Sequence, residues 1–168
     1  MTISMYSQTV PVFTRVLTNA KGWLDKATAF AEHKKFDTKV LVGTRLAPDM
    51  LPFSAQIQIA GDGAKGCVAR LAGVDIPKYE DNEATFADLQ ARLDKTIAFI
   101  NTITAAQREG SDAKEIVLPS RSGERKMSGE DYLRYYVQPN FFFHMTTTYN
   151  ILRHSGVDVG KGDFLPKA

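Results

Sequence analysis

The residues best suited to chemistry lie on one face of the last long helical stretch. His144 has Asn140 one turn before it and Thr148 one turn after it, so the three polar side chains share a helical face. Apolar residues at the same spacing indicate that this polar line points into the protein. An imidazole can bind a metal or move a proton near neutral pH. We therefore predict His144 and Asn140 as catalytic candidates, with Thr148 lining their pocket.

The helix that carries these residues is expected to run from Ser128 to Gly156. Ser128 suits the N-cap, and Asp131 three residues on can complete a capping box. Gly156 suits the left-handed residue that closes a helix. Pro139 lacks an N–H and frees a carbonyl one turn back, so it predicts a kink. The kink could shape a pocket, or Asn140 could simply satisfy the freed backbone.

A helix over residues 50–72 is expected to form the other wall of the pocket. Its apolar stripe has small residues at the centre, which would let another helix approach closely. The run Gly61–Gly66 also matches G-x-G-x-x-G, but the chain lacks the strand–helix alternation of a dinucleotide-binding fold. We therefore predict a helix there, with Gly61, Ala64 and, from the last helix, Tyr136 lining the pocket.

A metal site is the most specific chemistry that these residues suggest. A catalytic zinc takes three protein ligands, and the chain has only three histidines, at spacings that make no local motif. We predict His144 and Asp62 as ligands for zinc, nickel or iron. In the alternative, His144 is a buried neutral imidazole bonded to a neighbouring group, and Asp62 pairs with Lys65 or Arg70.

Composition places the chain among ordinary globular proteins. Its 168 residues, 43% hydrophobic and 24% charged, suit a single domain over 1–168. The net charge of +2 and the lack of a basic block argue against nucleic acid, and no apolar run approaches the roughly 20 residues of a membrane span. One cysteine, Cys67, fits a reducing compartment. We expect a cytoplasmic protein.

Two further helices and a hairpin complete the predicted fold. The first helix extends from about Tyr6 to His33, with Pro11 either opening or kinking it, and another begins at a Thr85–Asp88 capping box and ends near Gln107. A hairpin follows, with strands at 115–118 and 125–127 and a turn at 121–123. Residues 36–52 form an irregular crossover, in which an extended loop is favoured over a strand at 40–42. Phe164 and Leu165 are expected to pack on the body.

The whole pattern predicts an all-α four-helix bundle with long crossover connections and a small β-hairpin between the third and fourth helices. Three segments carry a resemblance: "LAPDMLPFSAQIQIAGDGAKGCVARLAGVDIP", "TFADLQARLDKTIAFI" and "NFFFHMTTTYNILRHSGVDVGKGDFL". They resemble an uncharacterised bacterial family, domain of unknown function 1993, a branch of the DinB/YfiT-like superfamily. The resemblance implies a DinB-like bundle, a homodimer, and a metalloenzyme related to enzymes that use low-molecular-weight thiols.

The resemblance also implies a metal site of three histidines, one on the second helix and two at i and i+4 on the fourth. His144 matches one fourth-helix ligand, but Asn140 and Thr148 flank it where a second histidine would stand. The second helix has no histidine, and its matching position falls among residues such as Gly61, Asp62 and Gly63.

Two functions follow. The first is a metal-dependent, thiol-transferase-like enzyme or its degenerate descendant, with His144 as ligand or acid–base group. The second is a non-catalytic small-molecule-binding or interaction module, with Asn140 and His144 as a core network.

Overall fold

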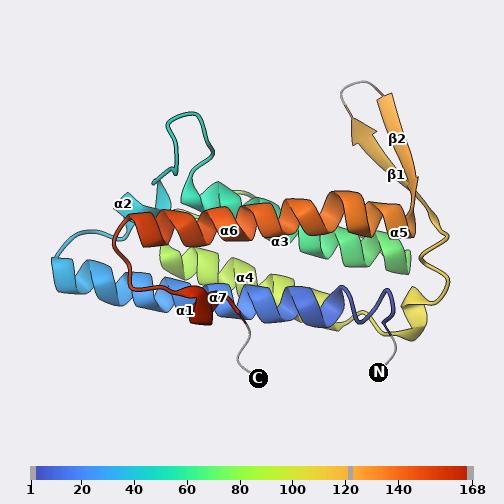
Figure 1. The fold of residues 1–168 in the computed structure, drawn as a ribbon, viewed down its shortest axis with the longest axis horizontal. Coiled ribbons are helices and arrows are strands. Elements are labelled where there is room, and N and C mark those ends of the chain that lie inside the picture. Colours follow the sequence, from blue (N-terminus) through green and yellow to red (C-terminus); the bar gives the residue numbers. More distant parts are fainter. Residues whose placement is uncertain (1–2, 121–122, 166–168) are drawn as a thin grey trace.

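The computed structural model describes residues 3–120 and 123–165 and is predominantly helical (Figure 1). The helices and strands occur in the following order: α1 (Val10–Lys34), α2 (Lys39–Val42), α3 (Phe53–Ala72), α4 (Phe86–Asn101), η1 (Ala106–Arg108), β1 (Glu115–Ser120), β2 (Gly123–Ser128), α5 (Gly129–Asp131), η2 (Tyr132–Val137), α6 (Gln138–His154) and α7 (Lys161–Phe164).

The four long helices α1, α3, α4 and α6 form a closed bundle. Helix α3 packs against both α4 and α6, and α1 completes the ring by packing against the same two helices. The predicted stripe of α1 is the one that is buried, with Phe13, Leu17 and Trp23 at 1% exposure or less. The predicted four-helix bundle is therefore confirmed.

Small residues on α3 let its neighbours approach, as the sequence suggested. A Cβ added to Gly61 would lie 3.6 Å from Thr96 Oγ1 of α4, and one added to Gly63 would lie 3.9 Å from Asn140 Nδ2 of α6. Ala64 is fully buried in the core. The glycine run is helical throughout, so it forms no phosphate-binding turn.

The capping residues were predicted correctly, but the C-terminal end of α4 was misplaced. Thr85 and Asp88 form the expected capping box, and Ser128 Oγ accepts a hydrogen bond from the Asp131 N–H. Helix α4, however, ends at Asn101 and not near Gln107. Thr104 and Gln107 bond to each other's side chains and begin a separate turn there, η1.

The crossover also differs from the prediction. Residues Lys39–Val42 form a one-turn helix and neither an extended loop nor a strand, because Asp37 Oδ1 accepts a hydrogen bond from the Lys39 N–H and starts the turn. Helix α3 begins at Phe53, three residues after the predicted start, with Pro52 in extended conformation at its N-cap.

The hairpin is present as predicted. Strands β1 and β2 pair antiparallel, with Glu115 opposite Ser128, and Figure 1 shows them projecting from one end of the bundle. Of the predicted turn at 121–123, residues 121 and 122 lie outside the described part of the chain. Within that part, no helix combines the length and apolar character needed to cross a bilayer.

Where the sequence predicted a kink at Pro139, the structure has a π-helical segment just before the proline. Residues Tyr132–Val137 form the wide π-helical turns of η2, directly before α6. Val137, directly before α6, is itself helical, so the helix continues from η2 through Pro139 without a new start. Wider turns of this kind are frequent at functional sites.

The C-terminal segment packs on α1 through an aromatic cluster. Phe164 stacks on Trp23 at 5.4 Å between ring centroids, and Trp23 Nε1 donates a hydrogen bond to the Asp163 carbonyl. Leu165 is 49% exposed, so the expected packing holds for Phe164 and fails for Leu165. Helix α7 is one turn long and ends at Phe164. Leu165 follows it in extended conformation and therefore leaves the packed face.

Phe164→Ala should therefore shift the fluorescence of Trp23, the only tryptophan, to longer wavelength by admitting water beside the indole. We also expect unfolding stability to fall by about 1–3 kcal/mol, the scale of the two aromatic pairs that Phe164 makes with Trp23 and Tyr149. Leu165→Ala, on an exposed residue, is the matched control. Equal emission spectra for both variants would contradict the packing described for α7.

Candidate functional site

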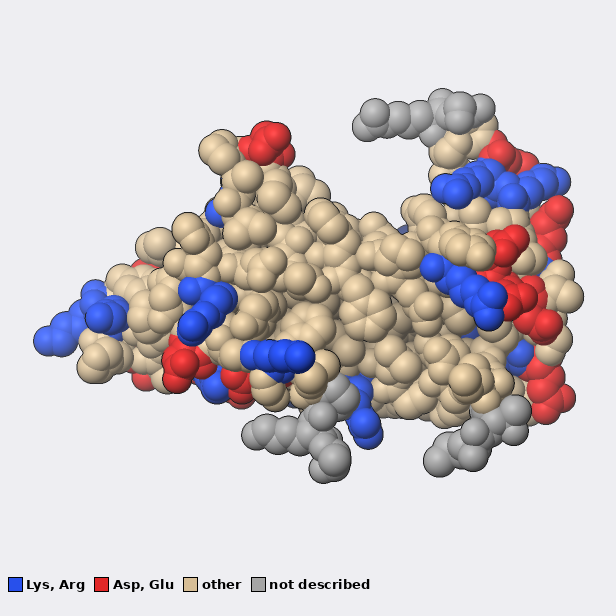
Figure 2. Space-filling model, viewed as in Figure 1, with Lys and Arg blue, Asp and Glu red and all other residues tan. Residues whose placement is uncertain are grey.

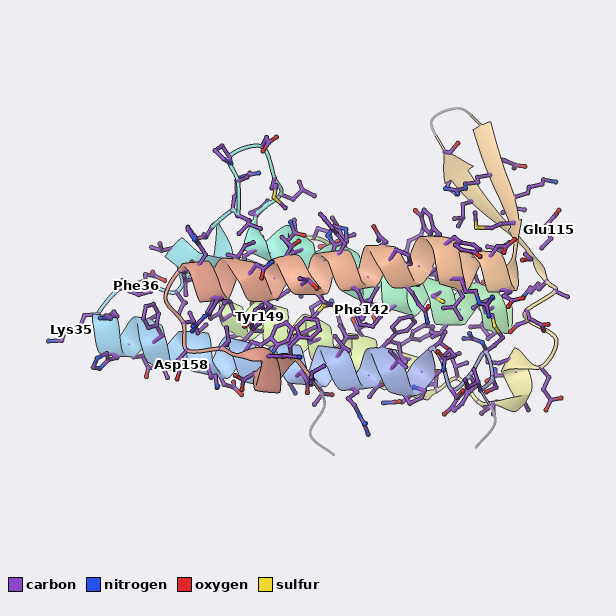
Figure 3. All side chains as sticks on the ribbon, viewed as in Figure 1. Lys35, Phe36, Glu115, Phe142, Tyr149 and Asp158 are labelled. Atoms are coloured by element: carbon purple, nitrogen blue, oxygen red, sulfur yellow. The ribbon has the colours of Figure 1, made fainter. Side chains whose placement is uncertain are left out.

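His144 lies between α6 and α3, held by a single strong hydrogen bond. Figure 3 shows Phe142 and Tyr149 of α6 pointing towards α1. Since successive helical residues differ by about 100°, His144 points to another side, towards α3. Its Nδ1 lies 2.7 Å from Oε1 of Gln56, and the residue is 8% exposed. The site is thus a buried imidazole bonded to the N-terminal part of α3.

Gln56 determines the tautomer of His144. Its amide Nε2 donates a hydrogen bond to the Leu51 carbonyl at 2.9 Å, which orients the amide. Oε1 therefore faces the imidazole, and a carbonyl oxygen can only accept. The proton consequently lies on Nδ1 of His144, which donates to Gln56, and Nε2 keeps its lone pair. Among the described residues, nothing donates a hydrogen bond to Nε2.

The imidazole is uncharged at neutral pH. Burial lowers the pKa of His144 below its usual 6.5, because the protonated form would lose hydration. Gln56 is neutral and 1% exposed, so it offers the ring no compensating negative charge. His144 is therefore a fixed hydrogen-bond and proton acceptor with Nε2 as the acceptor atom.

The other two members of the polar line are not bonded to the imidazole ring. Thr148 Oγ1 donates to the main-chain carbonyl of His144 at 2.8 Å, a bond that stays within α6. Asn140 is half-buried opposite Gly63, and no hydrogen bond joins it to His144 or to the backbone freed by Pro139 within the described chain. The predicted Asn140–His144 network is therefore absent there, and Gln56 takes the place of Asn140.

The remaining predicted site residues point elsewhere. Asp62 faces α4, where it pairs with Arg92 at 2.9 Å, and it also pairs with Lys65 at 2.7 Å. Gly61 also faces α4, as its close approach to Thr96 shows. Tyr136 is 42% exposed and stacks on Tyr132, 5.9 Å away. The structure does not bring these side chains to His144.

The residues around His144 do not fit the metal site that the resemblance implied. The second-helix residue that meets His144 is Gln56, five residues before Gly61, and its oxygen already accepts from the imidazole. Across residues 3–120 and 123–165, no three His, Cys, Asp or Glu side chains come together. Zinc needs at least three such ligands.

Gln56 was missed in the sequence, although it left a signal. It lies between Phe53 and Ile57 on the apolar face of α3, so it had to be buried. A buried amide needs partners for both its donor and its acceptor groups. Only the structure identifies these partners as Leu51 and His144, because one lies in a loop and the other 88 residues away.

The sequence alternative in which Asp62 pairs with Lys65 is confirmed, but the larger charged cluster to which this pair belongs was missed. Arg92, 1% exposed, pairs with Asp62, Asp81 and Glu83 at 2.9 Å each. The ring of Tyr79 receives Lys65 at 3.6 Å and Lys95 at 4.2 Å from its centroid. The cluster holds the segment between α3 and α4 against both helices, so its role is structural.

Two clefts on the surface do not include His144. One, of about 700 Å³, lies where the N-terminal segment meets η1 and α5 and has Arg108 in its wall. The other, of about 790 Å³, runs along the outer face of α1 beside α7. Both volumes are within the range of small-molecule sites.

Comparison with known proteins identifies the family of the chain. Residues 5–165 match the family described as "Domain of unknown function (DUF1993)". A crystal structure of a DinB family member protein from Shewanella denitrificans is 39% identical and superposes with a TM-score of 0.93, covering 98% of this chain and 93% of that one. No curated protein matches. The chain therefore belongs to the DUF1993 family and has the DinB fold.

Proposed function

We propose that this protein binds a small molecule through Nε2 of His144, without a metal ligand set. The observation that supports this is the Leu51–Gln56–His144 chain of hydrogen bonds, which leaves Nε2 as an acceptor without a partner in the described chain. Nε2 is not among the buried polar atoms of the described chain that lack a partner, so solvent or a ligand can reach it and donate a hydrogen bond to it. The ligand should therefore carry an O–H, N–H or S–H group.

The surroundings of His144 favour a ligand with an apolar body. Phe143 is 56% exposed and contacts the imidazole edge-on, 5.3 Å between ring centroids. Leu51, whose carbonyl holds Gln56, is 48% exposed. These exposed apolar side chains can pack against the apolar body of a ligand bound at Nε2.

Phenol and anisole test this proposal as a matched pair, because methylation removes the O–H and keeps the ring. Phenol should shift the Nε2 resonance of His144 in a saturable way and should bind about tenfold more tightly than anisole, as expected for one useful hydrogen bond. His144→Phe should abolish the difference. Equal responses to both probes, or none to either, would overturn the proposal.

A second candidate is general-base catalysis on a thiol, the co-substrate class of the enzymes that the resemblance suggested. An unprotonated imidazole can accept the thiol proton as sulfur attacks an electrophile and displaces its leaving group. The test is the reaction of 2-mercaptoethanol with 1-chloro-2,4-dinitrobenzene, which forms a thioether and releases chloride. The parent should accelerate it and His144→Phe should not. No acceleration by the parent would remove the catalytic proposal and leave the binding proposal.

The lowered pKa of His144 gives stability a specific pH dependence. The unfolded chain takes up the proton first, near pH 6.5, whereas the folded chain resists it to a lower pH. Unfolding free energy should therefore fall as pH decreases from 6.5 to the folded pKa and then level off. Urea unfolding of the parent should show this loss of unfolding free energy. The loss should be smaller in His144→Asn, and in His154→Asn it should equal that of the parent. Parallel curves for the parent and His144→Asn would contradict it.

A homodimer remains a prediction, and the exposed side of η2 and α6 is the surface on which to test it. Tyr135 and Phe143 are 71% and 56% exposed there. Burial of such residues is a usual source of dimer stability. Light scattering should give the mass of a dimer for the parent and of a monomer for Phe143→Glu. A monomeric parent would remove the prediction.

A further inference from the structure

Two arginines of the described chain are buried, and their surroundings differ. Arg92 is 1% exposed and has three carboxylate partners. Arg108 is 2% exposed and has no carboxylate partner anywhere in residues 3–120 and 123–165. Because a guanidinium keeps its charge when buried, Arg108 is a buried cation without a counter-charge.

The hydrogen bonds of Arg108 are few and long. Its Nη1 donates to the Val68 carbonyl at 3.4 Å and its Nη2 to the Met5 carbonyl at 3.3 Å, beyond the usual 2.9–3.0 Å. Its Nε is buried with no partner in the described chain, as is Nε of Arg92, so the two residues differ in their carboxylate partners and not at Nε. The Cys67 side chain is a third, weak partner, and a guanidinium with five donors still leaves part of its capacity unused.

The neighbours of Arg108 supply no negative charge. Burial raises the pKa of Cys67 to about 12, and burial also raises the pKa of Tyr132 to about 12. Both groups are therefore neutral at pH 7. Arg70 donates to the Tyr132 hydroxyl at 3.0 Å and adds a second cation nearby. Burial accordingly lowers the pKa of Arg108 itself.

The main chain holds Arg108 firmly in this position. Its N–H donates to the Ala105 carbonyl at 3.0 Å, and its own carbonyl accepts from the hydroxyl of Ser111 at 2.7 Å. The η1 turn therefore fixes the backbone of Arg108, unlike that of a residue in a mobile surface segment. A fixed, buried and unneutralised guanidinium is what a carboxylate-binding site requires.

Arg108 is one of the residues that line the 700 Å³ cleft, together with the apolar side chains of Met5, Tyr6 and Leu133. We propose that this cleft binds a small monocarboxylate with an apolar body, whose carboxylate pairs with Arg108. This site lies apart from His144, which does not line the cleft, so the inference goes beyond the function proposed above.

The acidic rim of the cleft disfavours ligands with several negative charges. Glu109 and Asp112 line the same cleft and are exposed, and Figure 2 shows acidic side chains gathered at this end of the molecule. Glu130 also lines it, but pairs with Arg134 at 3.0 Å. Polyanions such as phosphate esters would be repelled at the rim, whereas a single carboxylate would be repelled less and gain the buried guanidinium.

Benzoate and benzamide test the proposal, because they share shape and differ in charge. NMR titration of the unmodified protein should give saturable benzoate shifts at the amides of Met5, Tyr6 and Arg108, with benzamide about tenfold weaker or more. Inorganic phosphate at equal ionic strength should not reproduce them. No benzoate shifts, shifts confined to another region, or equal binding of benzamide would overturn the proposal.

Variants separate Arg108 from the rest of the cleft. Arg108→Met keeps an unbranched, though shorter, side chain and removes the charge, so it should lose benzoate binding by about tenfold or more. Arg153→Met, on an exposed residue of α6 that does not line the cleft, should keep binding within about threefold. Retained binding in Arg108→Met would overturn the assignment. If Arg108→Met fails to fold, the titration of the unmodified protein still decides the proposal.

Discussion

Arg92→Met should lower the free energy of unfolding by about 3–5 kcal/mol, because it leaves a buried carboxylate unpaired. The Glu83 side chain is 4% exposed and depends on Arg92 Nη1 at 2.9 Å and on Gln58 Nε2 at 2.8 Å. Asp62 and Asp81, at 42% and 59% exposure, can return to water. Most of the loss should therefore come from Glu83, and Glu83→Gln in the Arg92→Met background should recover part of it.

The pH dependence of this loss distinguishes the ion pair from lost packing. Burial acts to raise the pKa of Glu83, but hydrogen bonds from Arg92 and Gln58 outweigh it and lower the pKa below its usual 4.5. A depressed carboxylate pKa gives stability that is present above 4.5 and lost as pH falls through the folded pKa. The difference between parent and Arg92→Met in urea unfolding should therefore shrink below pH 4.5.

The matched control is Arg134→Met. Arg134 pairs with Glu130 at 3.0 Å, but the two side chains are 61% and 49% exposed. Such a pair should contribute about 0.5 kcal/mol or less. If Arg92→Met and Arg134→Met lowered the free energy of unfolding equally, the charged cluster around Arg92 would not stabilise the segment between α3 and α4.

Gly129→Ala should cost about 2–3 kcal/mol, because the added methyl group has no space. A Cβ at Gly129 would lie 1.8 Å from the Ser111 carbonyl oxygen and 2.8 Å from Leu71 Cδ2. The backbone cannot easily yield, since the next residue, Glu130, donates its N–H to the Asp112 carbonyl at 2.9 Å. The start of α5 is thus pinned to the segment after η1.

Gly22→Ala is the opposite case. Gly22 lies inside α1 with nothing within 4 Å of an added Cβ, so the change should stabilise the protein by about 0.5–1 kcal/mol through helix propensity. Thermal unfolding of both variants measures the contrast. A Gly129→Ala protein as stable as the parent would contradict the close approach between α5 and Ser111.

The long helices and their caps could be predicted because their signals are local. The Thr85–Asp88 capping box and the apolar stripe of α1 each lie within a few turns of sequence, and both are found in the structure. The end of α4 was misplaced because Thr104 and Gln107 form a competing turn. Side-chain bonds of that kind oppose helix propensity and are hard to weigh in advance.

The site could be predicted only in part because helical spacing fixes a side chain's face but not its partner. The inward face of His144 was predicted from the apolar stripe and is confirmed by its 8% exposure, while its role in a site stays a prediction. Asp62 was assigned to it because a carboxylate was sought on the second helix, whereas Arg92 of α4 binds that carboxylate. The true partner, Gln56, depends on a loop carbonyl that no periodicity reveals.

The most direct test of the central claim is the tautomer and pKa of His144, read by long-range ¹H–¹⁵N NMR of the imidazole nitrogens. The account predicts a proton on Nδ1, an unprotonated Nε2 at pH 7 and a pKa below 6.5. Gln56→Leu should release the preference for Nδ1–H. A proton on Nε2 at pH 7, or a pKa of 6.5 or higher, would contradict the assignment of Nε2 as the ligand-binding atom.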